Sequence, residues 1–279
     1  MLPSSYGMKP QLKINSQLVS FNGREEEFHY RVDIYTRGSH RNSLDRQLLG
    51  KYKKAGGEIT RKIFSWKDAL LNNGTIVAAD GYRSTICSRL GINRAERIGG
   101  AGICTAKGGF DRGLLYVLFN KEISSCGYSY LIPISETEAT VAVCMPGPDN
   151  LPQRLKKFQK IAGQGFSIKS FSGMHFGFEK VVRSPVPYME REKQKIYIVG
   201  DAAGTNEPLL GFGISNALAS GHHCAQSIIR GGPGAYARAF AEIQKANRRL
   251  LNIRKVLQSC GMNSLAERFF FGALKRLEP

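Results

Sequence analysis

The chain has 279 residues, and its 40 lysines and arginines against 22 aspartates and glutamates give a formal net charge of +18. A hydrophobic fraction of 42% is ordinary for a globular protein and excludes a disordered chain despite the charge. The length suits one large domain or two interleaved smaller ones. The composition therefore predicts a basic, folded protein that is large enough to be an enzyme.

The cysteine pattern excludes zinc ribbons and thioredoxin-type redox sites, because no two cysteines stand in a CxxC pair. The first residues, MLPSSYGMKP, lack the apolar segment of a secretory signal. Reduced thiols and a cytoplasmic location are therefore expected. The longest stretch without a charged residue, 208–229, contains histidine, asparagine and several glycines, so it does not predict a membrane span.

Positive charge is concentrated near the C-terminus, where five basic residues and no acid fall within 245–255: Lys245, Arg248, Arg249, Arg254 and Lys255. A solvated basic face and attraction to an anionic membrane surface both fit this cluster. No aromatic residue lies between these side chains, and the chain has no zinc finger or RNP motif. A nucleic-acid partner is therefore not expected.

The N-terminal part of the chain predicts strands first and then helices. Alternating apolar residues over 28–34, preceded by the turn pair Asn22-Gly23, predict a hairpin within 11–36. Residues 43–55 predict a helix that Ser43 caps. Residues 75–79 (TIVAA) predict a short buried strand, followed by an Asp-Gly turn and a helix through Leu90.

The remaining chain predicts a block of strands between two helical regions. Three β-rich runs within 100–145 predict an antiparallel meander with one covered face. Apolar spacing predicts helices over 151–162, from about Gly213 to 229, and from 236 onward, with a short strand at 196–199. Two strand-turn-helix segments separated by a strand block indicate a mixed α/β (α+β) architecture. In it, an antiparallel sheet is inserted into a doubly wound part.

The segment 195–221 (KIYIVGDAAGTNEPLLGFGISNALASG) has the features of a ligand site. Its apolar strand ends at Asp201, where a carboxylate can accept hydrogen bonds from ligand hydroxyls. Gly211 and Gly213 flank Phe212 and leave room for a flat ligand beside the backbone. The helix that follows offers N–H groups and a partial positive charge to an anion. These properties match a reduced flavin, and the alternative is a glycine-rich loop that only joins strand to helix.

A second strand-turn-helix segment, 75–92 (TIVAADGYRSTICSRLGI), places Asp80 at a strand end and Arg83 in the first turn of the next helix. Arg83 can pair with phosphate or carboxylate oxygens. Asp-Gly is also a common turn, so this segment alone is a weak signal.

Together, in this order, the two segments resemble the second and third fingerprints of FAD-dependent oxidoreductases of the aromatic-hydroxylase type. The second fingerprint typically reads G-A-D-G-x-x-S-x-V-R, and residues 78–87 read AADGYRSTIC. The final Arg is replaced by Cys87, with Arg89 as a substitute two positions on. The third typically reads G-D-A-A-x-x-x-x-P-x-x-G-x-G. It is matched by Gly200, Asp201, Ala202, Ala203, Pro208, Gly211 and Gly213.

Within that group the chain is similar to the geranylgeranyl reductase branch. Ile214, Ala217 and Ser220-Gly221 extend the third fingerprint in the way of that branch. Residues 128–133 (YSYLIP) resemble its Y-x-W-x-F-P sheet motif, with a tyrosine for tryptophan and an isoleucine for phenylalanine. The resemblance implies that Tyr128, Tyr130 and Ile132 line a substrate pocket. Plain cross-strand packing is the alternative for the two tyrosines.

The resemblance implies a domain plan and a set of cofactor contacts. Residues 41–99 and 180–232 correspond to a partial FAD/NAD(P)-binding domain, 8–40 and 100–179 to a substrate-domain sheet, and 233–279 to C-terminal helices. Ten residues would contact FAD: Asp80, Gly81, Arg83, Gly200, Asp201, Pro208, Gly211, Phe212, Gly213 and Ile214. NAD(P)H is the expected electron donor, and no motif places any of the five histidines as a catalytic acid.

The family's N-terminal G-x-G-x-x-G unit, which holds the ADP pyrophosphate, has no counterpart in the sequence. The chain is then a fragment of a longer flavoenzyme, or a partner chain supplies the ADP site, or the chain is a degenerate member. The implied activity is an FAD-dependent reductase of prenyl or lipid-like double bonds, with peripheral membrane association. The alternatives are a flavin monooxygenase or halogenase, and a non-catalytic remnant.

Overall fold

The computed structural model describes ten stretches of the chain: residues 3–39, 41–92, 97–124, 127–146, 150–162, 165–178, 187–191, 194–230, 232–259 and 271–272. The chain forms two compact units, each built from several segments. Unit 1 comprises Met1–Gly7, Leu49–Ile98 and Phe176–Arg254, and unit 2 comprises Met8–Leu48, Gly99–His175 and Lys255–Pro279. No helix within the described stretches is long and apolar enough to cross a membrane.

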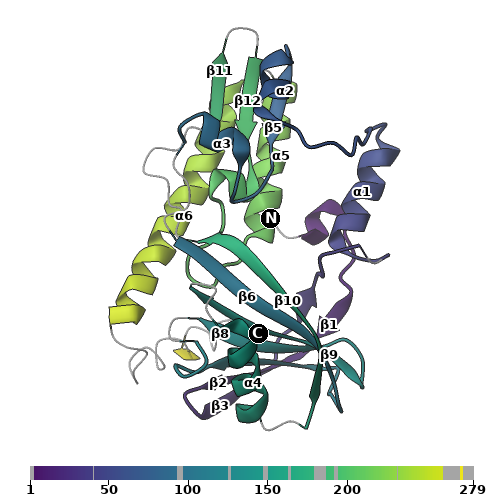
Figure 1. The fold of residues 1–279 in the computed structure, drawn as a ribbon, viewed down its shortest axis with the longest axis vertical. Coiled ribbons are helices and arrows are strands. Elements are labelled where there is room, and N and C mark those ends of the chain that lie inside the picture. The colour runs from purple at the N-terminus through teal and green to yellow at the C-terminus, as the bar shows by residue number, and fades with distance from the viewer. Residues whose placement is uncertain are drawn as a thin grey trace. The chain divides into compact units, whose positions relative to one another are not determined.

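Unit 1 is built on a three-stranded sheet in the order β11 (Tyr188–Arg191), β12 (Gln194–Ile198), β5 (Thr75–Ala78) (Figure 1). β12 runs parallel to β5 and antiparallel to β11. β12 buries four of its five residues, whereas β5 alternates between exposed and buried residues, and Val77 is 45% exposed. The expected strands at 75–79 and 196–199 are therefore confirmed.

Helices cover this sheet and complete the core of unit 1. They are α2 (Trp66–Leu71), α3 (Thr85–Arg89), the 3-10 turn η2 (Gly200–Ala203), α5 (Ile214–Arg230) and α6 (Pro233–Ser259). Tyr236 and Phe240 of α6 pack with Ile196 and Ile198 of β12 in one buried cluster. Each such side chain contributes about 1.5–3 kcal/mol when it is fully buried. Contacts of this kind hold α6 against the sheet.

Unit 2 contains a seven-stranded sheet in the order β10-β6-β9-β8-β7-β2-β3. In chain order its strands are β2 (Ser16–Phe21), β3 (Arg24–Phe28), β6 (Arg97–Lys107), β7 (Leu114–Phe119), β8 (Tyr128–Pro133), β9 (Glu138–Pro146) and β10 (Ser167–Phe178). The helix α4 (Leu151–Ile161) buries Leu155 and Phe158 in the core on one face of the sheet. Ile161, expected on the same face of the helix, is 41% exposed.

The predicted antiparallel meander is confirmed for β7, β8 and β9, but the sheet as a whole is mixed. β2 runs parallel to β7 over six residue pairs, from Ser16↔Leu114 to Phe21↔Phe119. This pairing joins segments about 100 positions apart, which local periodicity does not report. β2 and β3 thus lie in the same sheet as the strands of the 100–145 meander.

The predicted N-terminal hairpin forms over a shorter range. β2 and β3 meet at the Asn22-Gly23 turn, where both residues have positive φ (51° and 93°), as a tight hairpin turn requires. The expected strand over 28–34 is wrong, because β3 ends at Phe28. A separate strand β4 (Val32–Ile34) pairs instead with β1 (Leu12–Ile14), after the short 3-10 turn η1 (Pro3–Tyr6).

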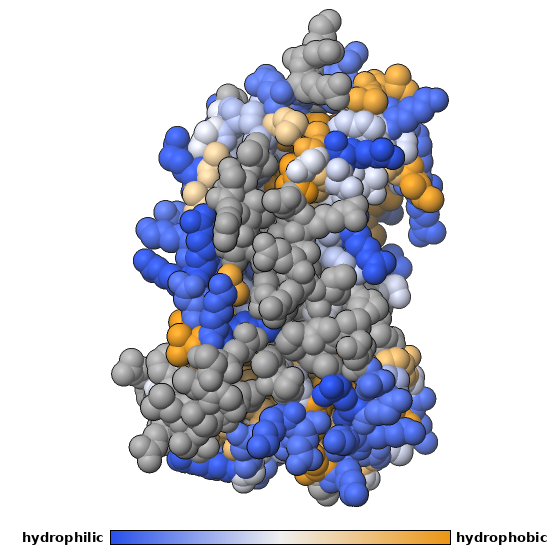
Figure 2. Space-filling model, turned by 60° about the vertical axis from the view of Figure 1, so that its left-hand side comes forward, coloured by the Kyte–Doolittle hydropathy of each residue, from blue (hydrophilic) through white to orange (hydrophobic). Residues whose placement is uncertain are grey.

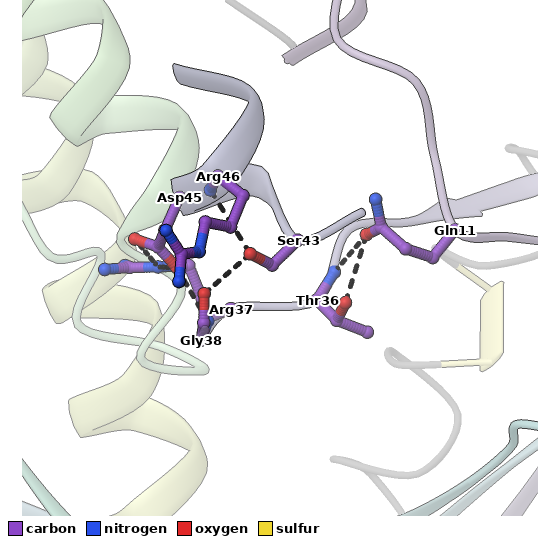
Figure 3. A network of polar contacts seen from close by, with 7 residues as sticks. All are labelled: Gln11, Thr36, Arg37, Gly38, Ser43, Asp45 and Arg46. Carbon is purple, nitrogen blue, oxygen red and sulfur yellow. Dashed lines mark hydrogen bonds and ion pairs between the residues drawn. The ribbon is translucent and has the colours of Figure 1, made fainter. Parts of the chain in front are cut away.

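The helix α1 (Leu44–Lys54) begins where the sequence predicts, and a polar network fixes its start (Figure 3). Ser43 Oγ accepts a hydrogen bond from the N–H of Arg46 at 3.2 Å and donates to the carbonyl of Gly38 at 2.6 Å. Asp45 accepts from Arg37 Nε at 2.8 Å and from the Gly38 N–H at 2.7 Å. Partial burial raises the pKa of Asp45, but these donors outweigh it and the pKa is lowered.

Candidate functional site

The segment with the strongest sequence signal is a strand-turn-loop-helix in unit 1, formed by β12, η2, the loop over 204–213 (the 204–213 loop) and α5. Gly200 has a φ of +60°, and its N–H donates to Ser220 Oγ of α5 at 2.9 Å. Ser220 Oγ in turn donates to the carbonyl of Ala217 at 2.9 Å. Gly200 therefore turns the chain sharply at the strand end and ties the turn to α5.

Gly211 and Gly213, expected to leave room for a flat ligand, have different structural roles. Gly211 has a φ of +79°, so it is required by the backbone conformation. A Cβ on Gly213 would lie 1.8 Å from Asn206 Oδ1 and 3.3 Å from Asp201 Oδ1. The space beside Gly213 is therefore filled by Asn206, and the half-buried Asp201 carboxylate lies next to the start of α5.

The carboxylate of Glu207, which the sequence analysis missed, organises the loop from inside. It accepts hydrogen bonds from the N–H groups of Leu209 (3.1 Å), Leu210 and Phe212 (3.4 Å). The backbone closes the same turn, since Glu207 N–H donates to the Phe212 carbonyl at 2.9 Å and Gly211 N–H to the Glu207 carbonyl at 3.1 Å. A glutamate just before a proline belongs to no general motif, so sequence patterns gave no indication of this role for Glu207.

The N-terminus of α5 presents unused donors. The first helical bond runs from Ala217 N–H to the Gly213 carbonyl at 2.8 Å. Within the described stretches, the N–H groups of Ile214 and Ser215 have no recorded acceptor, as is usual for the first turn of a helix. Together with the helix dipole, they favour an anion at this position. Phe212, immediately before, is 60% exposed.

Polar side chains of α5 and α6 bind the carbonyl groups of the 204–213 loop. Asn216 donates to the Thr205 carbonyl at 2.8 Å, and Arg254 donates to the Pro208 carbonyl at 2.7 Å. Arg254 is only 3% exposed, so this member of the C-terminal basic cluster does not belong to a solvated face. Pro208, expected to contact a cofactor, is buried and contributes its carbonyl to this network.

The second motif forms a short strand-turn-helix beside the first. Asp80 follows β5, Gly81 has a φ of +78°, and Asp80 Oδ2 accepts from the Thr85 N–H at 2.9 Å. The carboxylate of Asp80 thus caps the start of α3. The guanidinium of Arg83 lies 5.3 Å from the centre of the Tyr82 ring, and both Asp80 and Arg83 are exposed and reachable by a ligand.

Cys87, which stands where the fingerprint has arginine, connects the two motifs. Its thiol donates to the carbonyl of Ala202 at 3.3 Å, and the side chain is 1% exposed. Arg89, the suggested substitute, is exposed at the end of α3. Cys87 therefore joins α3 to η2 through a small buried thiol. Within the described stretches, no arginine has this role.

In unit 2, Tyr128, Tyr130 and Ile132 share one face of β8, because alternate residues of a strand point the same way. Tyr128 pairs with Cys144 of β9, and Tyr130 pairs with Ala142. Burial raises the pKa of the Tyr130 hydroxyl well above its usual value. Tyr128 is buried, whereas Tyr130 and Ile132 are half-buried and have surface to offer a ligand.

These residues continue an aromatic row across the sheet, on the face opposite α4. Successive ring centroids lie 5.7–6.4 Å apart, and the row consists of Phe28, Phe271, Phe21, Phe119, Tyr128 and Tyr130. Aromatic pairs at such distances stabilise packing by about 0.5–1.5 kcal/mol each. Cross-strand packing and a ligand-facing wall are both compatible with this arrangement.

Other reactive groups are sparse in the described part of the chain. Cys87, Cys104, Cys144 and Cys224 are buried free thiols, in line with the expected reduced state. Burial raises the pKa of Cys144 to about 12. The described residues contain no cluster of three or more His, Cys, Asp or Glu that suits a metal ion. Among the coloured residues of the face in Figure 2, hydrophilic side chains predominate and apolar ones lie between them.

Known proteins share both sequence and fold with this chain. No protein-family model matches it. It is 27% identical over 217 residues to a digeranylgeranylglycerophospholipid reductase of Methanosphaerula palustris, an alignment that covers 68% of this chain and 53% of that protein. The chain therefore spans about half the length of this relative.

Solved structures share the fold at low sequence identity. A geranylgeranyl bacteriochlorophyll reductase-like protein of Thermoplasma acidophilum matches with a TM-score of 0.67 and 17% identity, over 89% of this chain and 72% of that one. The myxobacterial chondrochloren halogenase CndH, an FAD-dependent enzyme, matches with a TM-score of 0.56 and 14% identity, over 91% and 68%. The chain is therefore similar in sequence to a digeranylgeranylglycerophospholipid reductase and shares the fold of FAD-dependent oxidoreductases.

Proposed function

We propose that this chain forms the isoalloxazine and ribityl side of an FAD site and acts as a reductase of double bonds in a prenyl or other lipid-like substrate. The observation that carries the proposal is the arrangement around Gly213. There the Asp201 carboxylate and the first N–H groups of α5, those of Ile214 and Ser215, lie at one helix start. An acceptor for hydroxyls beside donors for an anion is the chemistry that a reduced flavin requires.

The residues of unit 1 would divide the binding between them. Asp201 would accept hydrogen bonds from ribityl hydroxyls, and the start of α5 would stabilise the negative charge of the reduced ring. Asp80 and Arg83 are exposed at the neighbouring motif, where Arg83 suits phosphate oxygens. When bound, FAD supplies hydride transfer from an external donor such as NAD(P)H to the substrate.

We assign the substrate-facing role to Tyr128, Tyr130 and Ile132 of unit 2. An aromatic and aliphatic wall suits an apolar chain, because contact with lipid removes apolar surface from water. The sequence relative is named for a digeranylgeranyl glycerophospholipid, which supports a lipid-like substrate for this chain. Exposed basic side chains on α6, among them Lys245, Arg248 and Arg249, support transient attraction to an anionic membrane.

The proposal assigns only half of the cofactor to this chain, and that is testable. The adenine half would be held by residues from outside the two motifs, such as those of a partner chain. FMN carries the ring, the ribityl chain and one phosphate without the adenine. If the chain contacts only the flavin half and that phosphate, FMN and FAD bind it with affinities within about threefold, since the shared atoms supply the shared contacts.

The experiment is an equilibrium titration of the purified chain with each flavin, followed by visible absorbance and flavin fluorescence. Asp201→Asn keeps the size of the side chain and removes its charge, so affinity falls. Glu242→Gln on α6 is the matched control, because that carboxylate is 76% exposed and its ion pair with Lys245 spans 3.9 Å. Unchanged flavin affinity in Asp201→Asn contradicts the ribityl assignment.

A flavin-dependent monooxygenase or halogenase is the second candidate, supported by the shared fold with CndH. Fold alone does not separate these activities. Oxygen consumption separates them: a monooxygenase consumes oxygen with NAD(P)H when its substrate is added. A reductase saturates its substrate's double bond anaerobically, which mass spectrometry detects as a gain of two hydrogens.

A further inference from the structure

One face of α6 carries buried polar side chains where an ordinary core helix has apolar ones. Tyr236, Gln244, Asn247 and Arg254 are each at most 3% exposed. Their separations of eight, three and seven residues place them along one side of the helix. Burying polar groups costs free energy unless they are hydrogen-bonded, so this row requires partners.

The partners are backbone carbonyl groups of the strand end and the 204–213 loop. Tyr236 donates to the Ile198 carbonyl, and Gln244 donates to the Gly204 carbonyl at 3.2 Å. Asn247 Nδ2 lies 3.2 Å from the Thr205 carbonyl and 3.0 Å from the Asn206 carbonyl. Arg254 completes the row at the Pro208 carbonyl, 2.7 Å away.

Carbonyls held toward α6 determine where the following N–H groups point. In a trans peptide the C=O and N–H directions are opposed, so binding a carbonyl to α6 directs the next N–H away from it. The Thr205 N–H accordingly bonds the Gly200 carbonyl, and the Leu209 N–H bonds the Glu207 carboxylate. The row on α6 thus fixes both edges of the loop backbone.

We propose that Asn247 and Arg254 are positioning residues. They hold the 204–213 loop in the conformation that presents Asp201 and the start of α5 to the flavin. The identity of the ligand rests on the proposed function, whereas the claim that these residues hold the loop concerns this chain alone. Neither residue needs to touch the cofactor, since each acts through the loop backbone.

Hydrogen exchange of the full flavin-free chain tests whether Asn247 and Arg254 hold the 204–213 loop. Arg254→Met keeps most of the side-chain bulk and removes the donor, and Asn247→Ser shortens the reach to the loop. A charged hydrogen bond contributes enough to change local opening about 10- to 100-fold. We expect exchange at the amides of Glu207, Leu209 and Gly211 to accelerate by such a factor in Arg254→Met, and by less in Asn247→Ser.

The matched control is Arg248→Met, which changes an exposed arginine on the same helix. It should leave the exchange of the loop unchanged. If Arg254→Met does not fold, Asn247→Ser decides the question. Loop exchange equal to wild type in a folded variant, with α6 still protected, overturns the proposal.

Flavin titration separates this inference from the proposed function. If the wild-type chain binds no flavin, the proposed function fails while the exchange experiment still reports on the loop. If flavin binds, the variants with a loosened loop should lose affinity about tenfold and Arg248→Met should not. A loosened loop with unchanged flavin affinity overturns the positioning role.

Discussion

The carboxylate of Glu207 offers the sharpest test of how the 204–213 loop is held. Replacing it in Glu207→Gln leaves one acceptor oxygen and turns the other into an NH₂ group, which donates hydrogen bonds and does not accept them. Because Oε2 alone serves the Leu209 N–H while Oε1 serves Leu210 and Phe212, the best arrangement of the amide loses the Leu209 bond. The amide NH₂ then faces a backbone donor.

The size of the effect follows from the type of bond lost. Hydrogen bonds to a charged group contribute about 1.5–3 kcal/mol. Glu207 is half-buried, so the lower end applies, about 1.5 kcal/mol. For a protein of roughly this size, 1 kcal/mol shifts Tm by about 2–4 °C, so Glu207→Gln should lower Tm by about 3–6 °C.

Thermal unfolding followed by far-UV circular dichroism measures this shift, with flavin absent so that binding adds nothing to stability. The control Glu242→Gln makes the same chemical change at an exposed side chain whose one ion pair spans 3.9 Å. Its Tm should stay within about 1 °C of wild type, because exposed pairs contribute little. A Tm for Glu207→Gln that equals that of the control would refute the role given to this carboxylate.

Two further predictions concern a pair of glycines and the buried thiols. Gly127→Ala should destabilise the fold strongly, because the new Cβ would lie 1.9 Å from the carbonyl oxygen of Cys144. Gly221→Ala places its Cβ in open space on a helix, so it should stabilise the fold by about 1 kcal/mol. Urea unfolding measures the change in unfolding free energy for both variants. Burial raises the thiol pKa of Cys104 and Cys224 to about 11 and of Cys144 to about 12. The thiols of the unfolded chain ionise near pH 9, whereas those of the folded chain ionise only at a higher pH. The contribution of the thiols to stability is therefore full below pH 9 and is lost as the pH rises toward 12. An unfolding free energy that does not change from pH 8 to 11 contradicts this prediction.

The sequence predicts local structure well where one short segment contains all the information. Ser43 marks the start of α1, because its hydroxyl needs only the N–H three residues on. The Asn22-Gly23 turn is likewise determined by two residues that tolerate positive φ. Apolar spacing also placed α4 and α5, with bounds correct to within about one residue.

The elements that were missed depend on distant partners. The parallel pairing of β2 with β7 joins segments about 100 positions apart. α2, β10 and β11 lie in stretches with no strong period and were not predicted. Their formation depends on the sheets that they join or cover, which no window of sequence contains.

The candidate site divides in the same way. The fingerprint spacing alone singled out Asp201, Gly211 and Gly213. The structure adds why position 213 is a glycine: the Asn206 side chain occupies the space where a Cβ would lie. On α6, the expected apolar face in fact carries Asn247 and Arg254 toward backbone carbonyls. A buried polar side chain looks like a surface residue in sequence until its partner is known.

The most direct test of the central claim is whether this chain binds flavin. A titration of the purified chain with FAD, followed by visible absorbance, should show a perturbed flavin spectrum that saturates at one flavin per chain. That result is expected because Asp201 and the start of α5 offer complementary groups to the flavin. A spectrum identical to free FAD at every ratio, for a chain shown to be folded, would contradict the account.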